Sequence, residues 1–449
     1  MKKSIRIANG QGFWGDSVDA PRKLLKYGKI DYLTLDYLAE VTLSIMQMQK
    51  MKDDKKGYAL DFIELIDSSF FDIVNNKIKI ITNAGGVNPR ECAKKIIDIS
   101  KKYNKNIRVA VVTGDDIMDK IEEFNNNGCL FKNMDTNENF YKIKDSVCSA
   151  NVYINSFSIK KALSLGADIV LCGRVSDPGL ALGPMLYEFG WNENNYDKLA
   201  SGTLAGHIIE CGAQCTGGNY SRWEEVDDIS NIGYPIIEID SSGDFNITKP
   251  ENSGGLINKF TILEQVLYEM GDPSNYISPD VVVDFTSFNI NDHDNNKVSI
   301  TNVKGKVPTS TYKISINYIA GYKASGQLTI SAPKAIEKAE KIASIIWERL
   351  KKSGCKFDKT NTEYLGLSSC HKDMFSIPDE VNELVLKLTV RDNNKKNIIR
   401  FSKEIAPVIT NGLPGITGFA SGRPKVQPVI SFWPTLIDKN LIKTHIEIL

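Results

Sequence analysis

The first half of the chain repeats one pattern of apolar and polar positions. A short run of β-branched and other apolar residues leads into a turn rich in Gly or Asp, and a segment with helical spacing of apolar positions follows. The predicted strands are residues 4–8, 32–35, 77–82, 107–113 and 168–172. Strands that alternate with helices predict a parallel sheet with helices packed on it. We therefore expect an α/β N-terminal half with a mainly parallel sheet and flanking helices.

The second half has a different pattern. Residues 234–240 and 245–248 flank the turn sequence SSGD, which predicts a β-hairpin. Residues 333–352 have the apolar spacing of an amphipathic helix and begin with a proline. Further strands are predicted at 280–289, 297–304, 312–318 and 383–390, and further helices at 261–270 and 396–408. We expect an α+β C-terminal half and divide the chain into residues 1–232 and 233–449.

Composition excludes several classes of protein. The 449 residues carry 55 Lys and Arg against 55 Asp and Glu, so no net charge favours nucleic acid or an anionic membrane as partner. The N-terminal MKKSIRIANG lacks the apolar stretch of a signal peptide, and no apolar run approaches the roughly 18 residues of a membrane span. Eight cysteines without CxxC spacing are typical of reduced thiols. We therefore expect a cytoplasmic protein.

Residues 202–218 (GTLAGHIIECGAQCTGG) form the most unusual segment of the chain. If they are helical, His207, Cys211 and Cys215 fall at i, i+4 and i+8 on one face, with Glu210 beside them. Each helical glycine is about 1 kcal/mol less favourable than alanine. The glycines of this segment therefore indicate close backbone packing or a nearby ligand.

Several kinds of chemistry fit this segment. His207 or Glu210 could act as a general acid or base, and Cys211 could be a nucleophile with His207 as its base. Positions i and i+8 are roughly 12 Å apart, so one metal ion could bind at most a pair such as His207 and Cys211. The alternative is a packed core helix with inert thiols and a hydrogen-bonded histidine. We assign no metal ligand and no cofactor.

Ligands of parallel α/β sheets bind at the carboxyl ends of the strands. Two glycine-rich turns follow predicted strands, at residues 9–16 (NGQGFWGD) and 83–89 (NAGGVNP). Their backbone N–H groups would suit a phosphate or carboxylate, and the alternative is a pair of tight turns that need glycine anyway. The candidate ligand-binding residues of these turns are Asn9, Gly10, Gly12, Asn83, Gly85 and Gly86.

Charged residues also occupy strand ends. Arg174, with Asp177, follows the strand at 168–172 and could clamp a carboxylate, or could form only a local ion pair with Asp177. Four further carboxylates occupy strand ends, namely Asp36, Glu40, Asp115 and Asp116. They could supply acid–base chemistry or bind Mg²⁺, and the alternative is that they cap helices. We retain Asp36 and Asp115 as ligand-binding candidates.

Two loops could complete the site. Lys249 lies in a polar loop and could reach a phosphate or an enolate, or point into solvent. Residues 412–434 are rich in Gly and Pro but contain Phe432 and Trp433, so we expect an ordered loop that covers the site.

Eight ordered motifs along nearly the whole chain resemble the acyclic terpene utilisation family, of the AtuA type. They are RIANGQGFWGD, LDYLAE, TNAGGVNP, GADIVLCGRVSDPGLALGP, GTLAGHIIECGAQCTGG, ITKPENSGG, YISPDVVVDF and GLPGITGFASGRPKVQPVISFWPTLI. The resemblance implies a role in the catabolism of acyclic terpenes and related branched acids, beside enzymes of CoA-thioester chemistry.

Three functions follow as hypotheses. The first is a hydratase or lyase acting on a branched short-chain acid or its CoA thioester. The second is a non-catalytic subunit that binds acyl-CoA or organises a partner enzyme. The third and weakest is a dinucleotide-dependent oxidoreductase, since Gly10, Gly12 and Gly15 have GxGxxG spacing but enclose a bulky Phe-Trp pair.

The resemblance also implies a partner. Longer family members continue into a small ferredoxin-like domain, and this chain ends at Leu449 without its motif. We therefore expect a separately encoded ferredoxin-like subunit, docked on an apolar patch formed by Phe432, Trp433 and Pro434. Without that subunit, self-association as a homo-oligomer would cover the patch.

Overall fold

The computed structural model describes residues 2–38, 41–367, 369–371, 374, 376–418 and 422–449. The chain forms two compact units, the first made of Met1–Asn317 with Phe432–Leu449 and the second of Tyr318–Ser431. The predicted division at residue 232 does not coincide with this one. The reason is that the predicted hairpin after residue 232 pairs directly with the first strand and continues the main sheet of the first unit.

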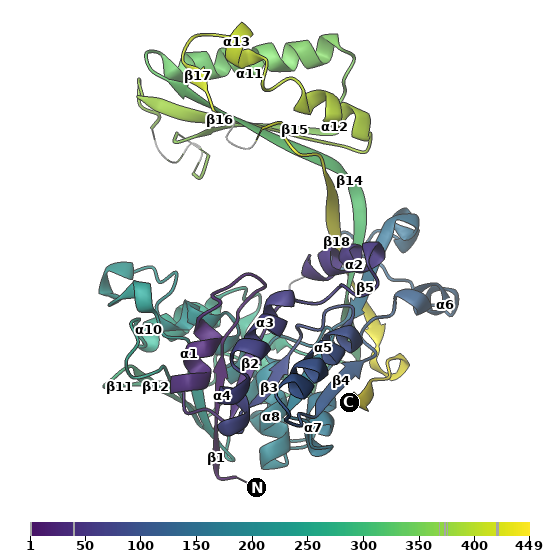
Figure 1. Ribbon diagram of the computed structural model, residues 1–449, viewed down its shortest axis with the longest axis vertical. Coiled ribbons are helices and arrows are strands. Elements are labelled where there is room, and N and C mark those ends of the chain that lie inside the picture. The colour runs from purple at the N-terminus through teal and green to yellow at the C-terminus, as the bar shows by residue number, and fades with distance from the viewer. Residues whose placement is uncertain (1, 39–40, 368, 372–373, 375, 419–421) are drawn as a thin grey trace. The chain divides into compact units, whose positions relative to one another are not determined.

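The first unit is built on a ten-stranded sheet (Figure 1). Its strands, in spatial order, are β11 (Asn289–His293), β12 (Lys297–Thr301), β8 (Phe245–Thr248), β7 (Ile236–Asp240), β1 (Ser4–Asn9), β2 (Tyr32–Leu35), β3 (Lys79–Thr82), β6 (Ile169–Cys172), β4 (Val109–Thr113) and β19 (His445–Ile448). The five strands from β1 to β4 in this order are parallel, and antiparallel strands extend the sheet on both sides. The predicted mainly parallel α/β sheet is confirmed.

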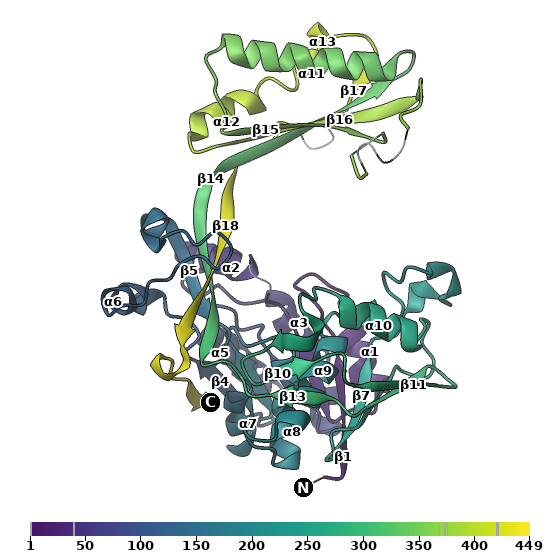
Figure 2. The same ribbon diagram turned by 180° about the vertical axis from the view of Figure 1, so that it is seen from behind.

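Helices cover both faces of the parallel strands. One face carries α1 (Ala20–Tyr27), α3 (Leu60–Ser68), α4 (Phe70–Asn75) and α5 (Pro89–Lys102), which face the viewer in Figure 1. The opposite face, seen in Figure 2, carries α7 (Phe157–Ser164), α8 (Gly179–Phe189) and α9 (Tyr196–Glu210). Because both faces are covered, the central strands are apolar throughout, with Leu33, Ile80 and Val170 fully buried.

Smaller elements complete the first unit. They are α2 (Thr42–Lys52), α6 (Ile121–Asn126), α10 (Lys259–Leu267), β5 (Val147–Val152) and a small sheet of β9 (Tyr276–Ile277), β10 (Val282–Asp284) and β13 (Lys304–Lys306). Single 3₁₀ turns occupy Met118–Lys120, Phe140–Lys142, Lys144–Ser146, Gly212–Thr216, Trp223–Glu225, Ile229–Asn231, Pro273–Asn275 and Lys439–Leu441. None of the helices in the described ranges combines the length and apolar character that crossing a bilayer requires.

The second unit has an antiparallel sheet with its own core. The sheet contains β14 (Thr311–Ser331), β15 (Lys359–Leu365), β16 (Glu383–Asp392) and β17 (Ile416–Thr417), and the helices are α11 (Ala335–Lys352), α12 (Lys395–Ser402) and α13 (Val408–Asn411). The α11 side chains Ala339, Ile342, Ala343, Ile346 and Leu350 are buried at helical spacing against this sheet. The predicted α+β character of the C-terminal half is confirmed for this unit.

The expected covering loop at 412–434 is in large part a strand, and residues 419–421 lie outside the described ranges. Residues Gln427–Asp438 form β18, which pairs with β14. Trp433 is 2% exposed, and its Nε1–H donates to the Phe131 carbonyl oxygen at 2.8 Å. The expectation that Trp433 forms an exposed docking patch is therefore wrong, because this ring is part of the core of the first unit.

Candidate functional site

Polar side chains gather where the parallel strands end at their carboxyl edge. Asn9 is the last residue of β1, Asp36 follows β2, Asn83 follows β3, Asp115 follows β4 and Arg174 follows β6. All five side chains belong to buried residues. Because these strands are parallel neighbours, their ends lie along one edge of the sheet.

Arg174 is committed to contacts inside the protein. It is 1% exposed, its Nη1 and Nη2 donate to the two carboxylate oxygens of Asp177 at 2.6 and 3.3 Å, and Nη1 also donates to the Leu38 carbonyl oxygen at 2.5 Å. The guanidinium lies 4.1 Å from the centre of the Tyr153 ring. The local ion pair with Asp177 therefore engages Nη1 and Nη2, while the buried Nε has no hydrogen-bond partner among the described residues. Arg174 holds Asp177, whose side chain stays 35% exposed.

Asp36 is a buried carboxyl with defined hydrogen bonds. Its Oδ1 accepts from Asn83 Nδ2 at 2.6 Å and from the Leu38 N–H at 3.0 Å. The Tyr37 N–H donates to Asn83 Oδ1 at 2.7 Å, which fixes the orientation of the amide. Burial and then the charge of Asp177 raise the pKa of Asp36 well above its usual value, against the opposing effect of Arg174. Asp36 is therefore a candidate proton donor.

Asp115 supports the turn that carries Arg174. Its Oδ2 accepts from the Arg174 N–H at 2.7 Å and from Asn151 Nδ2 at 3.0 Å, and burial raises its pKa to about 6. A Cβ at Gly173 would lie 2.2 Å from Asp115 Oδ1, so only glycine fits there. Asp115 is thus not a helix cap. Asp116 forms only a local turn, accepting from the Met118 N–H at 3.0 Å, and Glu40 lies outside the described residues.

His207 and Glu210 form a buried dyad at the end of α9. His207 Nδ1 lies 2.9 Å from Glu210 Oε1, and Nε2 lies 3.3 Å from the Val266 carbonyl oxygen. The imidazole also packs against the rings of Tyr276 and Phe285, each with centroids 5.3 Å away. The geometry and packing fix the position of the imidazole and of the carboxyl bonded to it.

The pKa values of both members of the dyad lie above their usual values. Burial raises the pKa of Glu210 to about 7, against the stabilising effect of His207 on the carboxylate. Burial lowers the pKa of His207, but the Glu210 carboxylate and nearby backbone carbonyls outweigh it and raise the pKa above its usual value. Glu210 Oε2 is buried and has no hydrogen-bond partner among the described residues. This oxygen therefore keeps an unused capacity to accept a hydrogen bond.

Two glycines explain how α9 approaches the Asp177 turn. A Cβ at Gly206 would lie 2.5 Å from the Pro178 carbonyl oxygen, and one at Gly202 would lie 2.6 Å from Leu182 Cδ1. The close packing predicted for this segment is therefore present. Its consequence is that Asp177 and Glu210 interact, since the charge of Asp177 contributes to the raised pKa of Glu210.

The predicted helix face of His207, Cys211 and Cys215 does not exist. α9 ends at Glu210, Gly212 has a φ of +59°, and Cys215 lies in a 3₁₀ turn. A left-handed glycine ends a helix, so positions i, i+4 and i+8 do not stack. Burial and the Glu210 charge raise the pKa of the Cys211 thiol to about 12, which disfavours the thiolate that a nucleophilic role would need.

The first glycine-rich turn holds the end of α9. Asn9 Nδ2 donates to the carbonyl oxygens of Ile209 and Glu210 at 2.8 and 3.0 Å. A Cβ at Gly12 would lie 2.8 Å from the Cys211 carbonyl carbon. Asn9 thus satisfies carbonyl groups that a helix end leaves unpaired. Gly12 allows its turn to approach the backbone of Cys211 closely.

Two backbone N–H groups of that turn are used internally. The Gly10 N–H donates to the Thr34 carbonyl oxygen at 3.0 Å, and the Gly12 N–H donates to Asp16 Oδ2 at 2.9 Å. An anion could bind to these two groups only by displacing their partners. The two bonds are those of a tight turn, and they weaken the case for a phosphate cradle formed by Gly10 and Gly12.

The second glycine-rich turn is also tightly packed. The Gly86 N–H donates to the Asn83 carbonyl oxygen at 3.0 Å, and its φ is +53°. A Cβ at Gly85 would lie 2.6 Å from Pro89 Cβ. Of the three candidates in this turn, only the Asn83 side chain belongs to the polar cluster.

Sequence reasoning missed the residues that hold the dyad. Gln265 is fully buried in α10, donates from Nε2 to the His207 carbonyl oxygen at 3.1 Å, and keeps Oε1 unpaired among the described residues. Tyr276 and Phe285 enclose the imidazole. None of the three lies in a spacing pattern with His207, although Tyr276 and Phe285 are the first and last residues of the motif YISPDVVVDF, which was the one signal in the sequence for them.

Lys249 does not belong to this cluster. It lines a separate cavity of the first unit, and its Nζ donates to the Ser253 carbonyl oxygen at 2.7 Å. Across the described part of the chain, no three His, Cys, Asp or Glu side chains are arranged to hold a metal ion.

The fold and the cluster define a class: an α/β protein with a buried carboxyl network at the carboxyl ends of its parallel strands. The family model for the acyclic terpene utilisation family protein AtuA matches residues 5–448. The chain therefore belongs to this family, whose name links it to acyclic terpene utilisation. No curated protein and no solved structure gave a significant match.

Proposed function

We propose that this protein is an enzyme of acyclic terpene or branched-chain acid breakdown that acts on a branched short-chain acid or its CoA thioester. The reaction is a hydration, its reversal, or a related lyase step by general acid–base catalysis. One observation carries the proposal: Glu210 has a pKa of about 7 and a buried oxygen, Oε2, without a partner among the described residues. A general acid or base works best when its pKa lies near the working pH.

We assign the two proton transfers of this reaction to two different groups of the cluster. In the elimination direction Glu210 Oε2 takes a proton from the carbon next to the carbonyl group, and the protonated carboxyl of Asp36 gives one to the leaving hydroxyl. A carbon–carbon double bond forms and water leaves. Solvent then returns a proton to Asp36 and removes one from Glu210, so the enzyme is regenerated.

The other members of the cluster are positioning residues. His207 fixes Glu210 through Nδ1, and Arg174 fixes Asp177 through its guanidinium. Asp115 in turn accepts from the Arg174 N–H. The helix end thus supports Glu210, and the strand-end turn supports Asp177, whose charge helps to raise the pKa of Asp36.

The test compares Glu210→Gln with the wild type on a panel of branched enoyl- and hydroxyacyl-CoA thioesters and their free acids. Water addition or loss is followed by mass spectrometry, and exchange of the substrate C–H proton is followed in heavy water. Glutamine keeps the shape and the contact with His207 but cannot take the proton. We expect turnover and exchange to fall at least about 100-fold, with an unchanged melting temperature.

The matched control is Glu269→Gln. Glu269 is exposed and its charge acts on Glu210, so the substitution changes the local charge without removing the proposed base. An equal loss of activity in both variants would refute the role of Glu210. A wild type that turns over no member of the panel and exchanges no proton would overturn the enzyme proposal and favour a non-catalytic acyl-CoA-binding or partner-organising subunit.

A further inference from the structure

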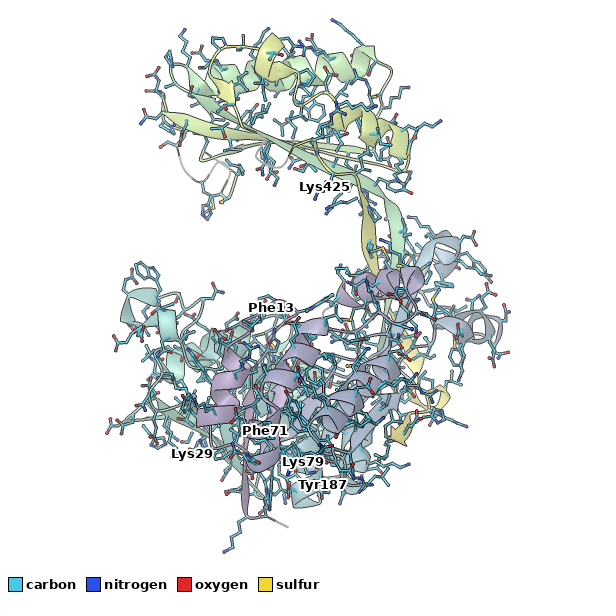
Figure 3. All side chains as sticks on the ribbon, viewed as in Figure 1. Phe13, Lys29, Phe71, Lys79, Tyr187 and Lys425 are labelled. Carbon is cyan, nitrogen blue, oxygen red and sulfur yellow. The ribbon has the colours of Figure 1, made fainter. Side chains whose placement is uncertain are left out.

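A second site of the first unit is lined by cations. The cavity has a volume of about 630 Å³ and lies between α1, the loop of residues 249–253 and the segment 231–234. Its charged lining residues are Arg6, Lys23, Lys26, Lys29, Lys249 and the single acid Glu251. Figure 3 labels Lys29, which follows the end of α1. In a chain without net charge, five cations against one anion is a marked local excess.

We propose that this cavity binds the diphosphate group of a nucleotide, which is the chemical group that ADP and CoA share. Small-molecule sites typically have volumes of about 300–1,000 Å³, and this cavity falls within that range. Lysines bind phosphates as point charges, and a concave surface of one sign concentrates the potential that attracts an anion.

The cations are not equally available. Arg6 forms an ion pair with Glu238 and donates from Nη2 to the Gly28 carbonyl oxygen at 3.2 Å. The positive charge of Arg6 is therefore largely neutralised by a protein carboxylate. Lys23 donates to Asn231 Oδ1 at 2.8 Å, a neutral partner. Lys23, Lys26 and Lys29 are exposed. Among the described residues no carboxylate forms an ion pair with these three rim lysines, so they can turn toward a diphosphate without breaking one.

Lys249 supplies a charge from inside the cavity. Its side chain is buried and its Nζ is bonded to a backbone carbonyl, that of Ser253. Burial lowers the pKa of Lys249, and the charge of Asp227 offsets this only in part. A bound phosphate would compensate the buried ammonium group. The loop is preformed, because a Cβ at Gly233 would lie 2.0 Å from Ser253 Oγ.

The same cavity offers a surface for the nucleoside. Leu24, Ile232 and Tyr234 line it, and the Tyr27 ring beside them is 59% exposed. An exposed tyrosine at the edge of a cationic cavity can stack on a base while the lysines contact the diphosphate. Charge and aromatic surface together therefore fit a nucleotide better than an inorganic ion.

The experiment measures binding to the full chain by calorimetry, with ADP, CoA, inorganic pyrophosphate and adenosine as probes. The test variant is Lys23→Gln with Lys26→Gln, two exposed positions of α1. The matched control is Lys95→Gln with Lys101→Gln, two exposed positions of α5 away from the cavity. We expect the α1 variant to weaken ADP and CoA binding at least tenfold, the control to change it less than twofold, and binding to weaken with salt.

Each outcome decides the proposal. Adenosine binding as tightly as ADP would overturn it, as would equal weakening by both double variants or no binding of ADP, CoA and pyrophosphate. Tighter binding of CoA than of ADP supports it and identifies CoA as the source of the diphosphate, and the reverse supports a simple nucleotide. The proposal does not rest on catalysis at Glu210, and Glu210→Gln should bind these probes like the wild type.

Discussion

Replacing Gly206 by alanine should destabilise the first unit even though alanine is the better helix former. The new Cβ would lie 2.5 Å from the carbonyl oxygen of Pro178, 2.7 Å from its Cα and 2.9 Å from its Cβ. Two of these are backbone atoms of the Asp177 turn, so no rotamer change relieves the overlap. Overpacking typically costs about 1–3 kcal/mol, and its upper end applies here, while helix propensity returns about 1 kcal/mol. We expect a net loss of about 2 kcal/mol.

The matched control is Gly202→Ala in the same helix, one turn earlier. Its Cβ would meet Leu182 Cδ1 at 2.6 Å and Met185 Sδ at 2.9 Å, both side-chain atoms that can move. The overlap therefore costs about 1 kcal/mol, which the gain in propensity offsets. Both variants are compared by urea unfolding followed by tryptophan fluorescence. The signal reports mainly the first unit, which contains Trp14, Trp191, Trp223 and Trp433, against Trp347 in the second.

A Gly206→Ala variant as stable as the wild type, or more stable, would refute the close packing of α9 on the Asp177 turn. Equal losses in both variants would show that the contact with a rigid backbone is not what distinguishes the two positions. The predicted result also has a functional readout. If α9 is pushed away from the turn, Asp177 acts less on Glu210, and the pH dependence of turnover should shift to lower pH.

Two further predictions concern stability. Burial raises the pKa of Asp115 to about 6 from 3.8, so the folded wild type holds a proton that the unfolded chain releases, and its free energy of unfolding falls as pH rises from about 4 to 6. Asp115→Asn removes this dependence. Its stability relative to the wild type should therefore increase by about 2.4 kcal/mol between pH 4 and 7 in urea unfolding, and a constant difference would contradict the raised pKa. Trp433→Phe leaves the Phe131 carbonyl oxygen without its indole donor and should cost about 2 kcal/mol in the same assay, whereas the exposed Trp223→Phe should change stability by less than about 0.5 kcal/mol.

The parallel core could be predicted because its signal is local. The apolar runs at 32–35 and 168–172 are each followed by a Gly- or Asp-rich turn, and the observed strands β2 and β6 lie within one residue of these limits. The amphipathic pattern at 333–352 likewise yields α11. In these segments the pattern that stabilises the element can be read within one stretch of chain.

The site could be predicted only in part, because its geometry depends on distant segments. Strand ends located Asp36, Asn83 and Arg174, since topology brings the ends of parallel strands together. The ion pair of Arg174 with Asp177 was one of the predicted alternatives, whereas the bond of Arg174 to the Leu38 carbonyl oxygen has no signature in the sequence. The end of α9 was missed because the left-handed Gly212 stops a helix that spacing alone would continue.

The last strand of the main sheet has a consequence for how the protein is made. β19 pairs with β4, matching His445 with Thr113, and Trp433 closes over Phe131. During synthesis the ribosome therefore completes β4, and then the whole of the second unit, before the segment that covers the edge of β4 emerges. Until then that edge presents unpaired N–H and C=O groups beside an open apolar core, a template for pairing with another nascent chain. The sheet of the first unit thus cannot be completed until β19 has been synthesised, while the second unit, encoded within the first, has all its residues available earlier.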